Sequence, residues 1–218
     1  MIKAVIYDLD DLMVNSHGLH VEASEKVFQK FGVSQEKLPE NIKAGFIGMR
    51  VSEILKELIK IYKLKINYQK VYKEREKVFL DLVMEKLEPM PGLFQSLEII
   101  SKSGYKIAIA SSGTKRYINL VLSKFKIANF FDIIVSGDDV KRGKPDPEIF
   151  LKTVRKLRLK PEETLVLEDA TVGIEAAKAA GCICIAVKNP YTPKQNLSKA
   201  DIKLNSLNNL NIGVIKAL

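Results

Sequence analysis

The chain has 218 residues, of which 46% are hydrophobic and 28% are charged, as in a folded globular protein. This balance excludes a disordered or low-complexity chain. Apolar runs such as IAIA and CICIAV are far shorter than the roughly 20 residues of a membrane-spanning helix. We therefore expect a globular protein with no membrane partner.

The 35 basic and 26 acidic residues give a net charge of +9 with both histidines neutral. Lysines often lie beside glutamates, as in KVYKEREKVF, a pattern typical of a solvated helix face. No nucleic-acid motif accompanies them, so we expect no nucleic-acid partner. A modest positive field would also attract a small phosphorylated anion.

The N-terminal sequence MIKAVIYDLDD places acids where a signal peptide carries its apolar stretch. The two cysteines, Cys182 and Cys184, are too few for a disulfide framework. Their spacing places both on one face of a predicted strand, where we expect them to be buried in the core. Both features favour a cytoplasmic protein, and we expect a monomer.

Short apolar runs rich in β-branched residues alternate with longer helical patterns. Near-continuous apolar character is typical of strands buried on both faces of a parallel sheet. The predicted strands cover residues 3–7, 106–110, 132–135, 164–167 and 182–187. This alternation predicts an α/β fold with a Rossmann-like, doubly wound parallel sheet.

Nearly a hundred residues separate the first two predicted strands, although a crossover needs only about a dozen. The surplus has helical patterns and predicts an inserted helical cap domain over residues 16–87. Residues 1–15 and 88–218 then form the core domain. The sequence PMPG at 89–92 marks the return to the core, and the tail after about residue 190 is predicted to be irregular.

Polar residues follow each predicted strand where it ends, and the carboxyl ends of parallel strands meet at one edge of a sheet. Carboxylates follow the first and fourth strands, a hydroxyl- and glycine-containing loop follows the second, and a basic loop follows the third. These residues are Asp8, Asp10 and Asp11; Ser111, Ser112, Gly113 and Thr114; Lys141, Arg142 and Lys144; and Glu168 and Asp169.

Together these groups point to phosphoryl transfer. Clustered carboxylates repel one another unless a cation lies among them, and hard oxygen ligands favour Mg²⁺. Lysine and hydroxyl groups neutralise phosphate oxygens, an aspartate can act as the nucleophile, and a second carboxylate can move the proton. Each group alone also fits an ordinary role in a turn or a helix cap, so the prediction depends on their combination.

The strings YDLDDLMVNS, IAIASSGT, GKPDPEIF and LVLEDATVGIEAAKAAG resemble the four motifs of the haloacid dehalogenase superfamily. They are most similar to its branch of β-phosphoglucomutase-like phosphatases. The resemblance runs from Ile2 to about Val187. It implies a Rossmann-like core with a helical cap and Mg²⁺-dependent chemistry through an aspartyl-phosphate.

The resemblance also assigns roles to individual residues. Asp8 matches the nucleophile and a metal ligand, and Asp10 matches the general acid/base, whose backbone carbonyl also binds the metal. Lys144 matches the lysine that neutralises the phosphoryl group and the nucleophile. The remaining matches are Ser111 as the hydroxyl that holds the phosphoryl group, with Ser112 and Gly113 beside it, Asp169 as a metal ligand, and Glu168 as a neighbouring acid of the metal site.

Two positions depart from the family pattern. Asp11 stands where the family usually has glycine, and Asn15 where it often has aspartate. Glycine allows backbone conformations that other residues resist, so Asp11 is expected to affect the geometry of the loop after the first strand. Asn15 lies at the hinge into the cap and is expected to affect cap closure more than chemistry.

Cap residues would meet the part of the substrate beyond the phosphate. The segment GFIGMR at 45–50 resembles the family's cap loop, which makes Arg50 a candidate substrate-binding residue. His20 matches a family position near the hinge and is a second candidate. For Arg50 the ordinary alternative is an exposed arginine at the start of a helix. For His20 it is a histidine that lies on a helix surface or packs against its neighbours.

The predicted function is a Mg²⁺-dependent phosphatase that acts on a small phosphorylated metabolite, a sugar or polyol phosphate. Because Asp10 carries a carboxylate where the namesake dehalogenases lack one, carbon–halogen hydrolysis is not expected. The first alternative is a β-phosphoglucomutase that interconverts β-glucose 1-phosphate and glucose 6-phosphate. The distant alternative is a non-catalytic binding protein.

Overall fold

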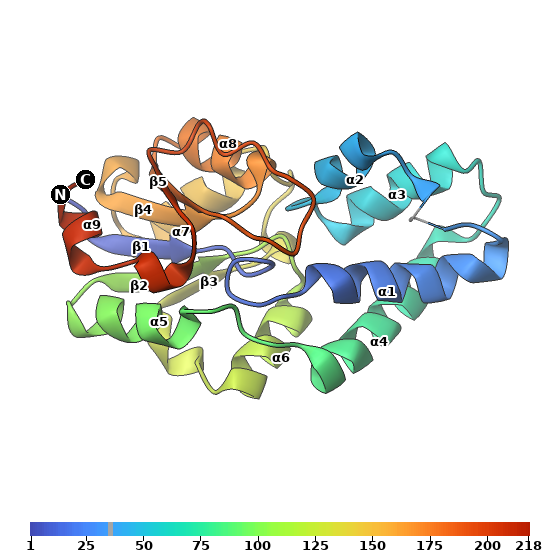
Figure 1. The fold of residues 1–218 in the computed structure, drawn as a ribbon, viewed down its shortest axis with the longest axis horizontal. Coiled ribbons are helices and arrows are strands. Elements are labelled where there is room, and N and C mark those ends of the chain that lie inside the picture. The colour runs from blue at the N-terminus through green and yellow to red at the C-terminus, as the bar shows by residue number, and fades with distance from the viewer. Residues whose placement is uncertain (35–36) are drawn as a thin grey trace.

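The computed structural model describes residues 1–34 and 37–218. Its centre is a six-stranded parallel sheet in the order β3-β2-β1-β4-β5-β6 (Figure 1). The strands are β1 (Ala4–Tyr7), β2 (Lys106–Ala110), β3 (Ile133–Val135), β4 (Thr164–Glu168), β5 (Ile183–Val187) and β6 (Ile202–Leu204). The doubly wound α/β fold predicted from the sequence is confirmed, with five strands close to their expected positions.

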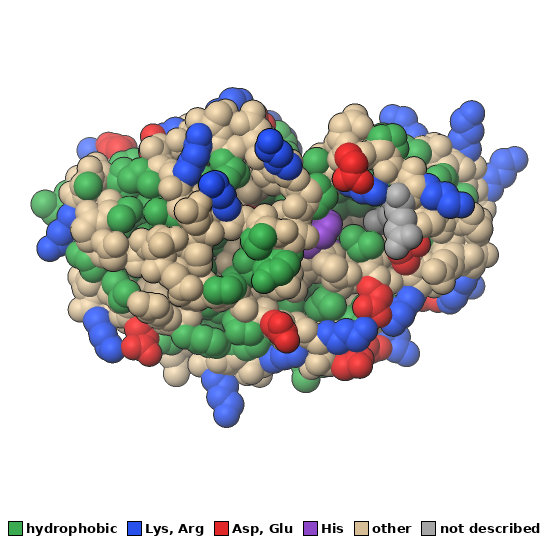
Figure 2. All heavy atoms as spheres, in the orientation of Figure 1, with side chains coloured by type: hydrophobic (Ala, Val, Ile, Leu, Met, Phe, Trp, Pro, Cys, Tyr) green, Lys and Arg blue, Asp and Glu red, His purple; other side chains and the backbone are tan. Residues whose placement is uncertain are grey.

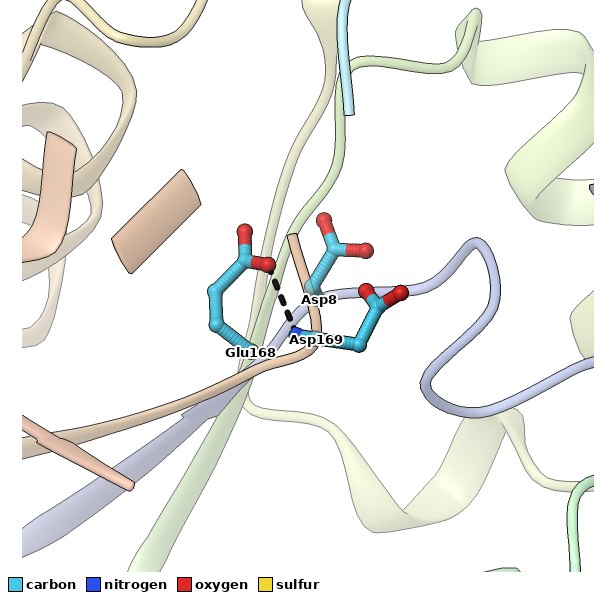
Figure 3. Close-up of side chains that lie close together, drawn as sticks. All are labelled: Asp8, Glu168 and Asp169. Atoms are coloured by element: carbon cyan, nitrogen blue, oxygen red, sulfur yellow. Dashed lines mark hydrogen bonds between the residues drawn. The ribbon is translucent and has the colours of Figure 1, made fainter. Parts of the chain in front are cut away.

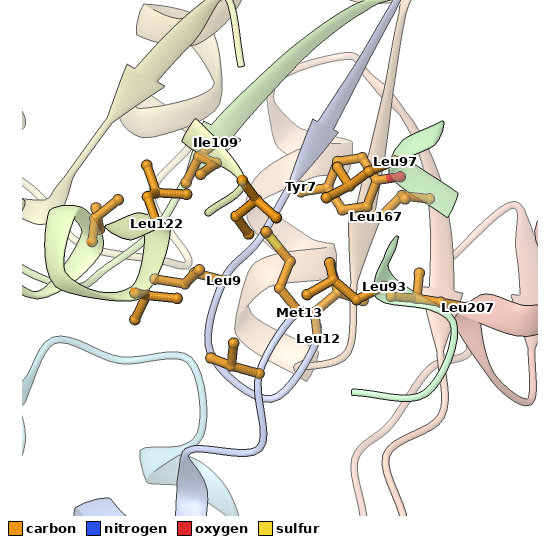
Figure 4. Packing of buried hydrophobic residues seen from close by; sticks show 14 of the residues in the cluster. Tyr7, Leu9, Leu12, Met13, Leu93, Leu97, Ile109, Leu122, Leu167 and Leu207 are labelled. Atoms are coloured by element: carbon orange, nitrogen blue, oxygen red, sulfur yellow. The ribbon is translucent and has the colours of Figure 1, made fainter. Parts of the chain in front are cut away.

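Alternate residues of each central strand supply two separate hydrophobic layers. Val5 and Tyr7 of β1 belong to the layer under α5 (Leu93–Lys102), α6 (Lys115–Phe125) and α9 (Ile212–Lys216). Ala4 and Ile6 face the opposite layer, under α7 (Glu148–Leu157) and α8 (Thr171–Ala179). Figure 4 shows the first layer, where the loop after β1 adds Leu9, Leu12 and Met13. This packing anchors the loop that carries the first acids.

Four helices form a lobe beside the sheet: α1 (His17–Phe28), α2 (Glu40–Phe46), α3 (Val51–Ile61) and α4 (Tyr68–Lys86) (Figure 1). They enclose a hydrophobic cluster of their own that includes Phe28, Leu55 and Val71. The two connections to the core lie side by side, because the Asn15 amide donates to the Glu88 carbonyl at 3.0 Å. We propose residues 16–87 as the cap domain.

The prediction of an irregular tail was wrong. Residues 202–204 form β6, which pairs in parallel with β5, and α9 packs its Ile215 into the first hydrophobic layer. The tail lacks the long apolar runs of the other strands because β6 is an edge strand of three half-exposed or exposed residues. Among the described helices, none has the length and apolar character to cross a membrane.

Candidate active site

The sheet brings the candidate acids together at the carboxyl ends of its central strands. Tyr7, the last residue of β1, is in register with Leu167 of β4 and Ile109 of β2. Asp8 therefore emerges beside Glu168 and close to Ser111. This is the switch point of the sheet, where strand order reverses and ligands of open α/β sheets bind.

Three buried carboxylates converge there, as Figure 3 shows. One oxygen from each of Asp8, Glu168 and Asp169 lies within 4.8 Å of the others. The Lys144 ammonium donates to Asp8 Oδ1 and to Glu168 Oε1, both at 2.5 Å, and its side chain is only 1% exposed. One buried cation thus serves two of the three acids.

The electrostatics of this cluster follow from burial. Loss of solvation raises the pKa of Asp8 well above its usual range, and Lys144 opposes that rise. Burial also raises the pKa of Asp169, with the neighbouring charge of Glu168 adding to it. For Lys144, burial would lower the pKa, but the two adjacent carboxylates outweigh it and raise the pKa. With all three carboxyl groups ionised, the site would have an excess of negative charge that Lys144 alone does not balance.

The donor set fits a hard divalent cation. Asp169 Oδ2 is buried and has no hydrogen-bond partner among the described residues, which is costly for a carboxylate oxygen. By contrast, both carboxylate oxygens of Glu168 accept hydrogen bonds within the protein. Oε1 accepts from Lys144, and Oε2 accepts from the amides of Asp169 and Ala170. Asp8 and Asp169 are therefore the side chains best placed to hold a metal, with Glu168 adding charge beside them.

Glu168 lies against the first turn of α8 because residue 173 is glycine. A Cβ atom at Gly173 would lie 1.8 Å from Glu168 Oε1. No side chain can occupy that space without displacing the carboxylate. Gly173 thereby lets Glu168 reach both Lys144 and the two backbone amides that follow it.

Asp10 lies in a different environment, at the junction of core and cap. Its Oδ1 accepts from the hydroxyls of Ser16 and Tyr117, both at 2.7 Å, and lies 3.3 Å from His20 Nε2. Its Oδ2 has one long contact, 3.5 Å from the Ser111 hydroxyl. One oxygen is thus held by three donors, and the other is available to a ligand.

These contacts fix the protonation states of the network. Burial would raise the pKa of Asp10, but the bonds from His20, Ser16 and Tyr117 outweigh it and lower the pKa. Burial lowers the pKa of His20, and the Arg75 guanidinium, which can only donate, requires an unprotonated Nδ1, so both favour the neutral imidazole. The neutral ring donates from Nε2 to Asp10 and accepts at Nδ1 from the buried Arg75 guanidinium, at 2.6 Å.

Asp11 has the left-handed backbone conformation, φ +62°, that the family's glycine would adopt without strain. Its carboxylate takes up a local role: Oδ1 accepts from the amides of Ser16 at 3.1 Å and His17 at 2.8 Å. Burial, followed by the charge of Asp10, raises the pKa of Asp11 to about 7. The aspartate thus caps the start of α1 and ties the first loop to the cap.

The loop after β2 faces both the acids and the cap. The buried Ser111 hydroxyl accepts from the Gly113 amide at 3.0 Å and lies close to Asp10. The Ser112 hydroxyl donates to the carbonyl of Gly48 in the cap loop at 2.8 Å. Gly48, at φ +81°, approaches so closely that a Cβ would lie 2.9 Å from Ala170 Cβ. The cap loop therefore contacts the core directly over the site.

Arg50 is directed at the core rather than at the acids. Its guanidinium donates to the carbonyls of Val140 and Lys141, at 3.0 and 3.1 Å, in the loop that leads to Lys144. It lines a cavity of about 280 Å³ between cap and core, together with His20 and Arg75. In this arrangement Arg50 joins the two domains.

Sequence reasoning missed Tyr117, Arg75 and Gly173. The segment around Arg75 was interpreted as a solvated face, and at this residue that was wrong, since Arg75 is 3% exposed. Its position between Val71 and Phe79, four residues from each on the buried face of α4, is the signal that could have identified it. Nothing local marks Tyr117, because its partner Asp10 lies 107 positions away. Gly173 lies only five residues after Glu168, within the string LVLEDATVGIEAAKAAG, and that string is the signal that could have identified it.

Comparison with known proteins agrees with this geometry. A family model described as haloacid dehalogenase-like hydrolase matches residues 5–187. A phosphorylated carbohydrates phosphatase from Thermotoga maritima is 34% identical over 83% of this chain and 82% of its own length.

Two solved structures share the fold. CbbY from Rhodobacter sphaeroides has a TM-score of 0.88 at 24% identity, over 99% of this chain and 100% of its own. A β-phosphoglucomutase from Clostridium difficile has a TM-score of 0.86 at 26% identity, over 100% and 96%. The chain belongs to the haloacid dehalogenase-like hydrolases, in their branch of phosphatases and β-phosphoglucomutase-like enzymes.

Proposed function

We propose that this protein is a Mg²⁺-dependent phosphatase that hydrolyses a sugar or polyol phosphate through an aspartyl-phosphate on Asp8. The observation that carries the proposal is the buried Asp8 carboxylate at the switch point, with Lys144 at 2.5 Å and Asp10 two residues along the same loop. A nucleophile, a phosphate-neutralising cation and a proton carrier thus lie at one site.

In the first step a carboxylate oxygen of Asp8 attacks phosphorus, and the bond from phosphorus to the ester oxygen breaks. The hydrogen bonds to Asp10 lower its pKa in the free site, so Asp10 takes up a proton from solvent when the negatively charged ester binds beside it. It then donates this proton to the departing alcohol oxygen through Oδ2, the oxygen not held by three donors. The ammonium of Lys144 and the hydroxyl of Ser111 balance and orient the phosphoryl oxygens.

In the second step Asp10, now ionised, accepts a proton from water as the water oxygen attacks the phosphorus of the aspartyl-phosphate. The acyl-phosphate bond breaks, inorganic phosphate leaves, and Asp8 returns to its carboxylate form. Asp8, Asp169 and the backbone carbonyl of Asp10 would hold Mg²⁺, with Glu168 as the adjacent acid. When bound, Mg²⁺ supplies positive charge that stabilises the phosphoryl oxygens.

The sugar or polyol class is supported by the relative named as a phosphorylated carbohydrates phosphatase. The β-phosphoglucomutase alternative requires a bisphosphate intermediate, and therefore a second anion site. Of two cap-side cations, Lys43 is paired with Glu40 at 2.9 Å, and Arg50 donates to two carbonyls while its buried Nε has no hydrogen-bond partner among the described residues. The preference for hydrolysis therefore rests on the relative named as a phosphatase, and the assay below separates it from transfer to a second hydroxyl.

The test measures inorganic phosphate released with Mg²⁺ from a panel of sugar, polyol and nucleotide monophosphates, with Asp8→Asn as the blank. We expect release that Asp8→Asn and a chelator both abolish. Conversion of β-glucose 1-phosphate to glucose 6-phosphate with little free phosphate would instead establish the mutase. Release that persists in Asp8→Asn would refute the assignment of the nucleophile.

A further inference from the structure

A cavity of about 350 Å³ runs from the acids into the cap. Asp8 and Asp10 line its core end, together with Ser112 and Gly113. Figure 2 shows the surface hollowed between the two domains, where a histidine side chain is visible. A phosphate ester held at Asp8 would therefore extend its alcohol part into this cavity.

The cap end of the cavity is mainly apolar. Its walls come from α2, α3 and the segments beside them and include Leu38, Phe46, Ile47, Val51, Ile54 and Leu55. Phe46, Val51 and Ile54 pack against the hydrophobic cluster of the cap and yet stay only partly buried. Apolar surface left in contact with water favours a ligand that covers it.

Several polar side chains in the cavity already have partners within the protein. Lys43 is paired with Glu40, and the buried Arg75 is bonded to His20 and to the hydroxyl of Ser24, at 3.3 Å. A hydroxyl-rich alcohol would give up its water here against aliphatic and aromatic side chains, with few groups left to bond it. The faces of a flat aromatic ring would lose little hydration against these side chains. The polar edge of such a ring would meet the polar residues of the lining, which include His17 and Lys43.

On the basis of the proposed phosphatase function, we propose that the substrate is a phosphorylated sugar that carries a flat aromatic ring. The ring lies against Phe46, Ile54 and Leu55 in the cap, and the phosphate lies at Asp8. Nucleoside 5′-monophosphates are the simplest esters of this class, because a base is attached to a sugar that bears the phosphate.

The test compares kcat/KM for uridine 5′-monophosphate and ribose 5-phosphate, which share the phosphorylated sugar and differ in the base. We expect the wild type to prefer the nucleotide at least tenfold, through a lower KM. Ile54→Asn places an amide in the cavity wall and should reduce the preference to less than threefold. Ile61→Asn is the matched control, since Ile61 lies on the same helix but is 39% exposed and outside the cavity lining.

Circular dichroism checks that the variants fold. Where Ile54→Asn does not fold, Val21→Asn, in the cavity wall contributed by α1, takes its place. Equal or better turnover of ribose 5-phosphate by the wild type, abolished by Asp8→Asn, would overturn this inference and leave the phosphatase function intact. A preference that survives the cavity variants would also overturn it. Absence of Asp8-dependent phosphate release from every ester would refute the proposed function itself.

Discussion

Asp11 allows backbone strain and helix capping to be separated by substitution at one position. It has φ +62°, and its carboxylate accepts from the amides of Ser16 and His17 at the start of α1. Asp11→Gly removes both the strain and the cap. Asp11→Ala removes only the cap, and Asp11→Asn keeps an acceptor oxygen in the same place.

The expected changes in the free energy of unfolding follow from two quantities. Loss of a side-chain cap lowers the free energy of unfolding by about 1 kcal/mol. The left-handed backbone conformation destabilises any residue that has a Cβ atom by about 1 kcal/mol or more. In Asp11→Gly the two effects have opposite signs, so we expect stability within about 0.5 kcal/mol of the wild type. In Asp11→Ala nothing offsets the lost cap and alanine tolerates the conformation less well, so we expect a loss of about 1–2 kcal/mol.

Urea unfolding followed by circular dichroism measures these differences, with Asp11→Asn expected close to the wild type. If Asp11→Gly proved as unstable as Asp11→Ala, backbone strain would make no contribution at this position. If Asp11→Asn proved as unstable as Asp11→Ala, an acceptor at this position would not be what stabilises the start of α1. Either result would refute the reasoning.

Three further predictions concern other contacts. Tyr117→Phe removes the hydroxyl that holds Asp10 and should lower kcat/KM about tenfold for an alkyl phosphate; p-nitrophenyl phosphate, whose leaving group needs no proton, should change little, and an equal loss for both would contradict this role. Burial would raise the pKa of Asp139, but the hydrogen bonds from Lys115 and Ser136 hold it well below its usual range. The ionised Asp139 therefore stabilises the fold at neutral pH. Asp139→Ala should therefore lower the free energy of unfolding by about 1–2 kcal/mol at pH 7. This difference between variant and wild type should shrink as the pH falls below roughly 4, where Asp139 begins to be protonated. Urea unfolding at pH 7 and at a pH below roughly 4 measures the difference, and a difference that stays constant would contradict the prediction. Mg²⁺ should raise the unfolding temperature of the wild type in a thermal scan, by linkage worth about 2.7 kcal/mol at 100 times its Kd; an equal rise in Asp169→Asn would contradict the metal site.

The central strands and the loops after them could be predicted because their signals are local. A buried parallel strand needs a continuous apolar run, and the residue after it falls at one edge of the sheet whatever the neighbouring strands are. The candidates Asp8, Ser111 and Asp169 follow from this rule without knowledge of strand order. Lys144 lies nine residues after β3, in a loop with two other basic residues, and only the family resemblance singled it out. β6 escaped prediction because an edge strand of three residues needs no such run.

The contacts of Asp10 could not be predicted because they depend on tertiary packing. Tyr117 reaches Asp10 across 107 positions of the sequence, and only the packing of α6 beside the loop after β1 brings them together. For Arg50 the residue type is visible in the sequence, but its partners are carbonyls some 90 positions away. Sequence identifies groups capable of binding an anion, and the position of the cap decides which of them are free to do so.

The net charge of +9 can be interpreted only when it is known which charged residues are buried. Among the described residues, the buried charges are four acids and two bases, all at the sheet edge or the cap junction: Asp8, Asp11, Glu168, Asp169, Arg75 and Lys144. By formal charge, the interior of the site is therefore negative, and the rest of the protein is more basic than the overall count indicates. A basic exterior attracts an anionic substrate, and an acidic interior needs a cation before a phosphate can approach its nucleophile. The same charge distribution thus favours both a phosphorylated substrate and a divalent metal, which the composition alone could not show.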